Sequence, residues 1–287
     1  MSSSAAYGSG SGVLAIAHRG GAAMGPENTM EAFETAVALG YTHLETDVRR
    51  TADGVCVAFH DRTLRRVTGA PGNLSDLSWD DVTRLRVSGC GPVGGTGAVP
   101  RVEDLLTAWP DVRWALDVKQ PSAIPALVRA VRAANAEHRV CLSGTWDRWL
   151  IAAHRALGPA ASLALGWRSM TSLVAGQRLS LRGHGYVHLP LTVAGRPFAW
   201  PRVVERAQTH GLRLIVWGLV QSADMHRLLD HGVDGIFTDH IDVLREVLVA
   251  RGEWRPAVVP REPACRRPPD LSRLFKTGVP PLRSVEA

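Results

Sequence analysis

Side chains able to bind a metal ion and to move protons are concentrated near the start of the chain. They occur in four short motifs, His18-Arg19-Gly20-Gly21, Pro26-Glu27-Asn28-Thr29, Glu45-Thr46-Asp47 and His60-Asp61. Two histidines, an arginine and several carboxylates within about forty positions are more polar chemistry than a buried framework needs. Gathered in one pocket, they would form a metal-assisted site that cleaves phosphodiesters.

A hairpin is predicted to bring part of this set together. Asp53-Gly54 separates two β-prone runs that lie between Asp47 and His60, and Asp-Gly in such a context is the strongest short-range hairpin signal. A two-residue loop would place Asp47 directly opposite His60, with Cβ atoms about 5 Å apart. Period-two alternation would put Glu45 on the same face of the sheet. A bulge would shift this register by one residue.

A second run with strand character ends in similar chemistry. In the segment from Val112 to Lys119, alternation turns the apolar residues to one side and Asp117 and Lys119 to the other. The carboxylates of Glu45, Asp47 and Asp117 are hard oxygen ligands, which suit a hard divalent cation. Asp117 and Lys119 could instead form an ion pair.

The order of these motifs resembles that of the glycerophosphodiester phosphodiesterase family, over the segment from about Val13 to about Leu248. Late in the chain, Gly232–Asp239 is similar to the closing strand of that family, and Trp217 falls where its Trp-x-x-Asn motif would begin. Several separate motifs in the same order are a more specific match than one short pattern.

The resemblance implies a reaction and the residues that carry it. It implies Mg²⁺ or Ca²⁺ on Glu45, Asp47 and Asp117, with His18 and His60 as the catalytic acid–base pair. Which histidine acts as the base is left open, as is the choice between a cyclic phosphate intermediate and direct attack by water. The expected products are glycerol 3-phosphate and a free alcohol.

Other polar and aromatic residues are assigned to the substrate. Arg19 and Lys119 would bind the phosphate charge, and Trp217 would contact the substrate. Glu27 could lie beside the metal ligands or fix a loop through Arg19. Among the remaining polar residues, His43, His188 and Asp239 are interpreted as structural.

Two departures from the family pattern leave alternatives open. Val220 takes the place of the motif's asparagine, and Asp117 stands where glutamate is common. The first alternative is a lysophospholipase D, which an apolar groove in residues 61–100 would favour. The second is a catalytically weak module that binds glycerophosphodiesters, which the loss of the asparagine would favour.

Strand and helix patterns alternate along the chain and predict an α/β fold of the (β/α)8 TIM-barrel type. Eight strands are expected, at Val13–Ala17, Thr42–Val48, Val112–Val118, Arg139–Ser143, Ser162–Gly166, Tyr186–Leu189, Arg213–Trp217 and Gly235–Thr238. Helices are expected between them, including Met30–Leu39, Ile124–Ala136, Trp146–Leu157, Pro201–His210, Ala223–Asp230 and Ile241–Val249. The run from Val55 to His60 would be a hairpin arm at the mouth, and 61–100 a small cap insertion over it.

Composition bounds the class of protein. The 287 residues are 45% hydrophobic, enough for a single barrel spanning 13–250. No run is long and apolar enough to span a membrane, no signal-peptide layout precedes the barrel, and a cytoplasmic enzyme is expected. The four cysteines show no CxxC spacing, which argues against disulfides or zinc.

The two ends of the chain are expected to lie outside the barrel. Residues 1–12 read as a flexible leader and 251–287 as a poorly ordered Pro/Arg-rich tail. The tail holds eight Lys/Arg against four Asp/Glu, most of the net charge of +6. This distribution argues against nucleic acid as a partner, and the family resemblance implies a small phosphodiester substrate instead. Peripheral membrane contact through the tail, for example at Leu271, Leu274 or Phe275, remains open, and the oligomeric state is not indicated.

Overall fold

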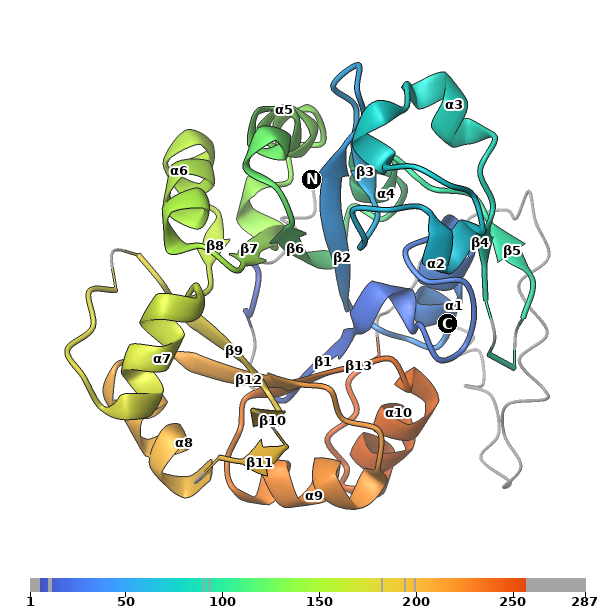
Figure 1. Cartoon of the computed structure of the whole chain (residues 1–287). Helices are drawn as coiled ribbons and strands as arrows, with labels where there is room; N and C mark the ends of the chain where they lie inside the picture. The colour runs from blue at the N-terminus through green and yellow to red at the C-terminus, as the bar shows by residue number, and fades with distance from the viewer. Residues whose placement is uncertain are drawn as a thin grey trace, which may run out of the picture.

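The computed structural model shows a ring of strands surrounded by helices (Figure 1). It describes residues 6–9, 12–89, 91–92, 94–181, 183–193, 195–198 and 200–256. Most of the expected tail, 257–287, therefore lies outside the described residues. None of the helices in the described ranges is long and apolar enough to cross a membrane.

Eight parallel strands form the barrel and confirm the predicted fold class. In spatial order they are β8 (Ser162–Leu163), β7 (Val140–Gly144), β6 (Arg113–Val118), β2 (His43–Arg50), β1 (Leu14–Ala17), β13 (Gly235–Thr238), β12 (Arg213–Trp217) and β9 (Tyr186–Pro190). Ala164 pairs with Tyr186 in a parallel bridge, and Leu165 N donates to Tyr186 O at 2.9 Å. These contacts join β8 to β9 and close the ring.

One helix follows each barrel strand along the chain. These helices are α1 (Met30–Ala38), α4 (Val102–Ala108), α5 (Ile124–Ala133), α6 (Asp147–Leu157), α7 (Trp167–Ala175), α8 (Trp200–Thr209), α9 (Ser222–Asp230) and α10 (Ile241–Ala250). Their apolar faces pack on the outer surface of the sheet and form the main core. Thr29 caps the start of helix α1: its hydroxyl accepts from Ala32 N at 3.3 Å and so satisfies an amide of the first turn.

The amino end of the barrel is closed by a residue of the expected leader. Tyr7 is only 4% exposed, and its ring meets His43 and Tyr186 edge to face at 5.5 and 5.2 Å. Its main chain is anchored too, since Tyr186 Oη donates to Tyr7 O at 3.0 Å. The expected flexibility of residues 1–12 is therefore wrong at Tyr7.

The hairpin arm forms, but its predicted register is wrong by one residue. Strand β3 (Cys56–Ala58) pairs with β2 so that Val48 faces Ala58, and His60 therefore does not face Asp47. The loop has three residues instead of two, because Gly54 adopts a positive φ of 88° and Thr51 N donates to Val55 O at 3.0 Å. A left-handed glycine in the last loop position is typical of three-residue hairpins.

The insertion 61–100 forms a small subdomain beside the mouth rather than over it (Figure 1). It contains α2 (Arg65–Thr68), α3 (Trp79–Thr83), and the paired strands β4 (Val87–Ser88) and β5 (Thr96–Gly97). Its own apolar cluster is centred on Leu64, Leu74 and Val82. The described residues of this subdomain do not line the cavity at the barrel mouth.

Candidate active site

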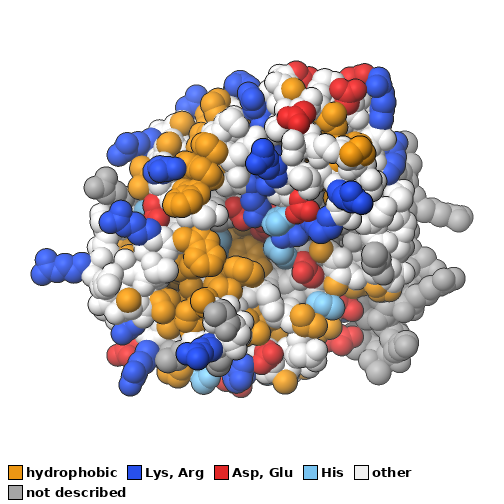
Figure 2. Space-filling model, viewed as in Figure 1, with side chains coloured by type: hydrophobic (Ala, Val, Ile, Leu, Met, Phe, Trp, Pro, Cys, Tyr) orange, Lys and Arg blue, Asp and Glu red, His pale blue; other side chains and the backbone are white. Residues whose placement is uncertain are grey.

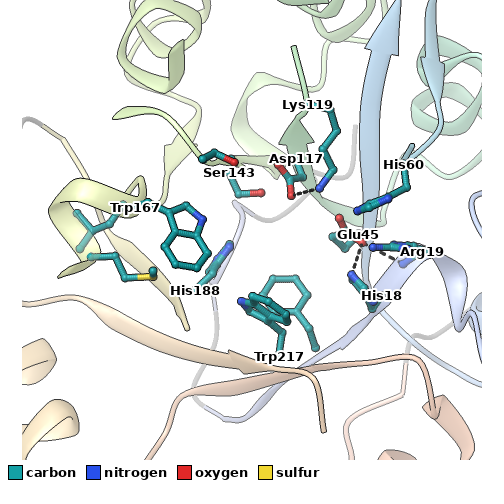
Figure 3. A pocket seen from close by; sticks show the side chains of 15 residues that line it. His18, Arg19, Glu45, His60, Asp117, Lys119, Ser143, Trp167, His188 and Trp217 are labelled. Atoms are coloured by element: carbon teal, nitrogen blue, oxygen red, sulfur yellow. Dashed lines mark hydrogen bonds and ion pairs between the residues drawn. The ribbon is translucent and has the colours of Figure 1, made fainter. Parts of the chain in front are cut away.

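A cavity of about 290 Å³ opens at the carboxyl ends of the barrel strands, where active sites of this fold form. Figure 3 shows its side chains converging from several strands. Its lining includes six ionisable predicted site residues, the predicted Trp217, and further residues that are mostly apolar: His18, Arg19, Glu45, His60, Asp117, Lys119, Ser143, Gly144, Thr145, Leu165, Trp167, Met170, His188, Trp217 and Phe237.

The turn after β1 holds the first motif in an unusual backbone conformation. Arg19 adopts a positive φ of 52°, followed by Gly20 at 80° and Gly21 at 93°. A side chain at Gly20 would come within 2.8 Å of the Ala32 Cβ on α1, so glycine is required there. This tight turn lets Arg19 N donate to Glu45 Oε2 at 3.0 Å.

Three carboxylates meet at the floor of the site and could hold a divalent cation. Glu45, Asp47 and Asp117 each offer a ligand atom, and these atoms lie within 4.8 Å of one another. Asp47 and Asp117 come together because they face each other in the β2–β6 register. Asp47 Oδ1 is buried, and its ion-pair partner is the Lys119 ammonium, 2.9 Å away. The donor set fits a hard divalent cation, and aspartate at position 117 reaches the cluster.

Asp47 is held from three sides. Its Oδ2 accepts from Asn28 Nδ2 at 2.8 Å and lies 3.0 Å from Arg19 Nε, while its Oδ1 lies 2.9 Å from Lys119 Nζ. Asn28 itself accepts from Thr46 Oγ1 at 2.8 Å and adopts a positive φ of 56°. Asn28 is therefore a positioning residue of the site, a role that was not predicted from the sequence.

The two carboxylates of β2 respond oppositely to their surroundings. Burial works against charge on both, but Lys119 and Arg19 outweigh it at Asp47 and hold the pKa of that carboxyl well below its usual range. Glu45 lacks comparable compensation, so burial and the neighbouring Asp47 raise its pKa to about 7. Adjacent buried negative charges of this kind favour a bound cation.

His18 is oriented by a carboxylate that sequence reasoning had treated as structural. His18 Nδ1 lies 2.7 Å from Asp239 Oδ1, which leaves Nε2 on the cavity side, 3.8 Å from Glu45 Oε2. Burial alone would lower the pKa of His18, but Glu45 and Asp239 outweigh it and raise it to about 9. The closing motif Gly232–Asp239 thus supplies a partner to the first motif, as the parallel β1–β13 pairing requires.

His60 has an equivalent partner in its own motif. Its Nδ1 lies 2.6 Å from Asp61 Oδ1, and Arg66 Nε from the insertion donates to Asp61 Oδ2 at 2.7 Å. The loop is further fixed by Arg49 Nε, which donates to His60 O at 2.7 Å. His18 and His60 therefore both use Nδ1 to bind an aspartate, which orients the ring and leaves the other nitrogen for substrate.

The remaining predicted polar residues form an ion-pair network around the cluster. Glu27 accepts from Arg19 at 3.1 Å and from Arg66 at 2.7 Å. These contacts make it a loop-fixing residue that joins the first turn to the insertion. Lys119 Nζ lies 2.8 Å from Asp117 Oδ2 and also contacts Asp47, so the predicted ion pair is present within the carboxylate cluster.

The apolar side of the cavity contains Trp217 together with residues that sequence reasoning missed. Trp167 and Met170 follow the very short strand β8, and Ser143 closes β7 beside Asp117. In the sequence, the apolar residues that directly follow the end of a strand could have indicated that Trp167 and Met170 line the cavity. His188 also lines the cavity, and burial lowers its pKa to about 3, which keeps the ring neutral.

Val220 does not belong to the cavity lining. Its side chain is 49% exposed, and it follows Trp217 on the loop after β12. The valine that replaces the motif's asparagine therefore leaves the carboxylate cluster and the two histidines untouched.

Comparison with known proteins agrees with this geometry. The chain matches the sequence model of the glycerophosphoryl diester phosphodiesterase family over residues 18–243. A Mycobacterium tuberculosis protein named "Probable glycerophosphodiester phosphodiesterase 2" is 36% identical over 252 residues, covering 85% of this chain and 93% of that protein.

Solved structures share the fold at lower sequence identity. A glycerophosphodiester phosphodiesterase from Agrobacterium tumefaciens superposes with a TM-score of 0.68 at 22% identity, covering 83% of this chain and 99% of that one. An Oleispira antarctica phosphodiesterase, solved in complex with the product sn-glycerol-3-phosphate, superposes with a TM-score of 0.67 at 18% identity, covering 83% of this chain and 97% of that one. Motifs, site geometry and the family match agree, and the chain belongs to the glycerophosphoryl diester phosphodiesterase family.

Proposed function

We propose that this protein hydrolyses glycerophosphodiesters to glycerol 3-phosphate and an alcohol, as a metal-dependent phosphoric diester hydrolase. The observation that carries the proposal is the carboxylate cluster Glu45, Asp47 and Asp117, which lies in one cavity with two aspartate-bound histidines. Family membership supports the same reaction class.

The chain's own residues would bind and orient the substrate. A hard divalent cation, Mg²⁺ or Ca²⁺, on the three carboxylates would neutralise phosphate charge and lower the pKa of a nucleophilic hydroxyl. Arg19 and Lys119 lie on the same side of the cavity and would bind the remaining anionic oxygens. Trp217 would form the apolar wall against which the organic part of the substrate packs.

His18 and His60 would carry the protons. Both rings line the cavity, and each is bound at Nδ1 by an aspartate, so the Nε2 atoms are the positions available for proton exchange. One ring would take the proton of the attacking hydroxyl, and the other would protonate the departing alkoxide. Protonation matters because an alkoxide is a poor leaving group.

The two alternatives from the sequence lack structural support. The lysophospholipase D interpretation depended on a groove within 61–100, yet the described residues of that subdomain do not line the cavity. The binding-module interpretation depended on Val220, which lies outside the lining with its side chain 49% exposed.

The test is release of glycerol 3-phosphate from glycerophosphocholine and from a lysophospholipid, in EDTA, Mg²⁺ or Ca²⁺. We expect metal-dependent turnover that His60→Ala lowers by about 10²- to 10⁴-fold. His231→Ala is the matched control, because His231 is exposed at the end of α9. Turnover that persists in EDTA, or that survives His60→Ala, would contradict the mechanism. A folded protein that binds substrate without turnover would favour the binding module.

A further inference from the structure

The exposed large apolar side chains of this protein are concentrated at one end of the barrel. Of the described residues, five such side chains lie at or just past the ends of strands β7, β8, β9 and β12: Trp146 (50% exposed), Trp167 (43%), Val193 (44%), Trp217 (38%) and Val220 (49%). We call these five residues the apolar rim. Val249 on α10 is exposed as well, at 38%, but it is on the outer ring of helices.

The apolar rim borders the active-site cavity on the side away from its charged residues. Figure 2 shows hydrophobic side chains gathered on one side of the central hollow, with the histidines on the other. Trp167 and Trp217 belong to both the rim and the cavity lining. Trp146, Val193 and Val220 do not line the cavity, so substrate binding inside it does not explain their exposure. Exposed apolar patches of this kind mark contact surfaces.

The charges on the loops that carry the rim have mostly one sign. The segments 145–149, 164–170, 190–198 and 217–223 contain three arginines, Arg148, Arg168 and Arg196, against a single acidic residue, Asp147. All three arginines are exposed. Asp147 is turned to the backbone of the neighbouring loop, where its Oδ1 accepts from Gly166 N at 3.2 Å. The surface therefore presents positive charge around apolar groups.

One of these arginines lies directly against the rim. The Arg148 guanidinium is 5.4 Å from the centre of the Trp146 ring and 6.0 Å from that of Trp149. Tryptophan beside arginine is the combination found at the level of lipid headgroups, where the indole enters the interface and the guanidinium meets phosphate.

We propose that the apolar rim docks on the surface of an anionic lipid bilayer, with the active-site cavity opening toward that surface. The exposed tryptophans and valines would enter the interface, and the arginines would bind anionic headgroups. Docking would place the cavity beside the lipids from which glycerophosphodiesters are released. This surface differs from the C-terminal tail that the sequence had suggested for membrane contact.

The test is co-flotation of the full chain with phosphatidylcholine vesicles, with and without phosphatidylserine, in EDTA. Because EDTA removes divalent cations, the result does not depend on turnover or on the proposed function. We expect binding to the anionic vesicles, weaker binding to phosphatidylcholine alone, and a decrease of about fivefold for Arg168→Ala. Trp146→Ala is expected to reduce binding about tenfold or more while turnover of soluble glycerophosphocholine stays unchanged.

A matched pair of valines separates the rim from a general charge effect. Val220→Asp and Val249→Asp make the same chemical change at two exposed positions, and only Val220 is on the rim. We expect Val220→Asp to lose vesicle binding and Val249→Asp to keep it. Equal losses in both variants, or no flotation of the wild type, would overturn the proposal.

Two other occupants would give different results. If the rim buries a second copy of the chain, light scattering without lipid would show a dimer that Val220→Asp dissociates. If it holds only the tail of a single lipid, a monomeric lysophospholipid would bind while vesicles would not. Either outcome would overturn docking on a bilayer.

Discussion

The two ends of the barrel use histidine in opposite ways. At the carboxyl end, His18 lies among Glu45 and Asp239, and these carboxylates raise its pKa to about 9 in spite of burial. At the amino end, His43 is buried with arginines as the nearby charges, and its pKa falls to about 3. His18 directly follows β1, and His43 begins the neighbouring strand β2. The difference shows that the surrounding charges, more than the residue type, decide whether an imidazole here is charged.

The ends also differ in how they meet solvent. Tyr7 and Tyr186 close the amino end over His43, while the carboxyl end opens as a cavity of about 290 Å³. The closed end therefore contributes to stability, and the open end to chemistry, which agrees with the general division of this fold.

Replacing one histidine at each end of the barrel with glutamine tests whether the two ends differ in function. His18→Gln removes a ring from the cavity, and we expect turnover of glycerophosphocholine to fall by about 10²- to 10⁴-fold. His43→Gln makes the same change at the closed end, and we expect turnover near that of the wild type. Steady-state kinetics at saturating metal measure both. Equal losses in the two variants would show that the ends are not functionally distinct.

Tyr7, which closes the amino end of the barrel, is expected to have a large effect on stability. Tyr7→Ala should lower the free energy of unfolding by about 3 kcal/mol, because a fully buried aromatic ring is removed from a packed cavity. Tyr7 Oη is buried and has no hydrogen-bond partner among the residues that the structure describes, so Tyr7→Phe should cost little or nothing. Urea unfolding followed by fluorescence measures both. A wild-type stability for Tyr7→Ala would mean that the leader does not seal the barrel in solution.

Sequence patterns predicted the barrel well because its physical basis is local. Alternating strand and helix runs identify the eight strands, and the apolar side of each strand is visible in the sequence. Strand β8 spans only Ser162–Leu163, shorter than the expected Ser162–Gly166, because the chain leaves the sheet to begin α7 at Trp167. The sequence also predicted that the carboxylates of Glu45, Asp47 and Asp117 lie together, and they do, because Asp47 faces Asp117 in the register of β2 and β6 and Glu45 lies two residues before Asp47 on β2.

What the sequence could not predict depends on single backbone angles and distant contacts. Gly54 with φ 88° lengthens the hairpin loop and shifts its register, and nothing in Asp53-Gly54 alone distinguishes the two loops. Tyr7 lies in a small-residue leader, yet it packs on strands far away in sequence. Asp239 follows β13 and reaches His18 only because the barrel closes between the first and last strands.

Asn28, which binds the carboxylate cluster from behind the cavity, provides a further test at the open end of the barrel. Asn28 binds Asp47 and Thr46, so Asn28→Ala would release a metal ligand from its fixed orientation. We expect Mg²⁺ or Ca²⁺ affinity to fall by about 10- to 100-fold, measured by calorimetry on the folded protein. Thr29→Ala is the control, because it removes the adjacent helix cap and should lower stability without changing metal affinity. Equal affinity in Asn28→Ala and wild type would contradict the positioning role.

The last prediction concerns stability at acid pH, and it tests whether His43 at the closed end stays neutral in the folded protein. The pKa of His43 is about 3 in the folded protein, against a usual value of 6.5. Between pH 3 and pH 6.5, His43 therefore binds a proton in the unfolded chain but not in the folded protein. The contribution of neutral His43 to the free energy of unfolding is therefore complete above pH 6.5, and it is lost as the pH falls from about 6.5 toward 3. At pH 5 this loss amounts to about 2 kcal/mol. The drop in unfolding free energy from pH 7 to pH 5 should be smaller in His43→Gln than in the wild type, by about that amount. An unchanged difference would mean that His43 accepts a proton inside the folded barrel, and the two ends would then differ in chemistry but not in how they treat charge.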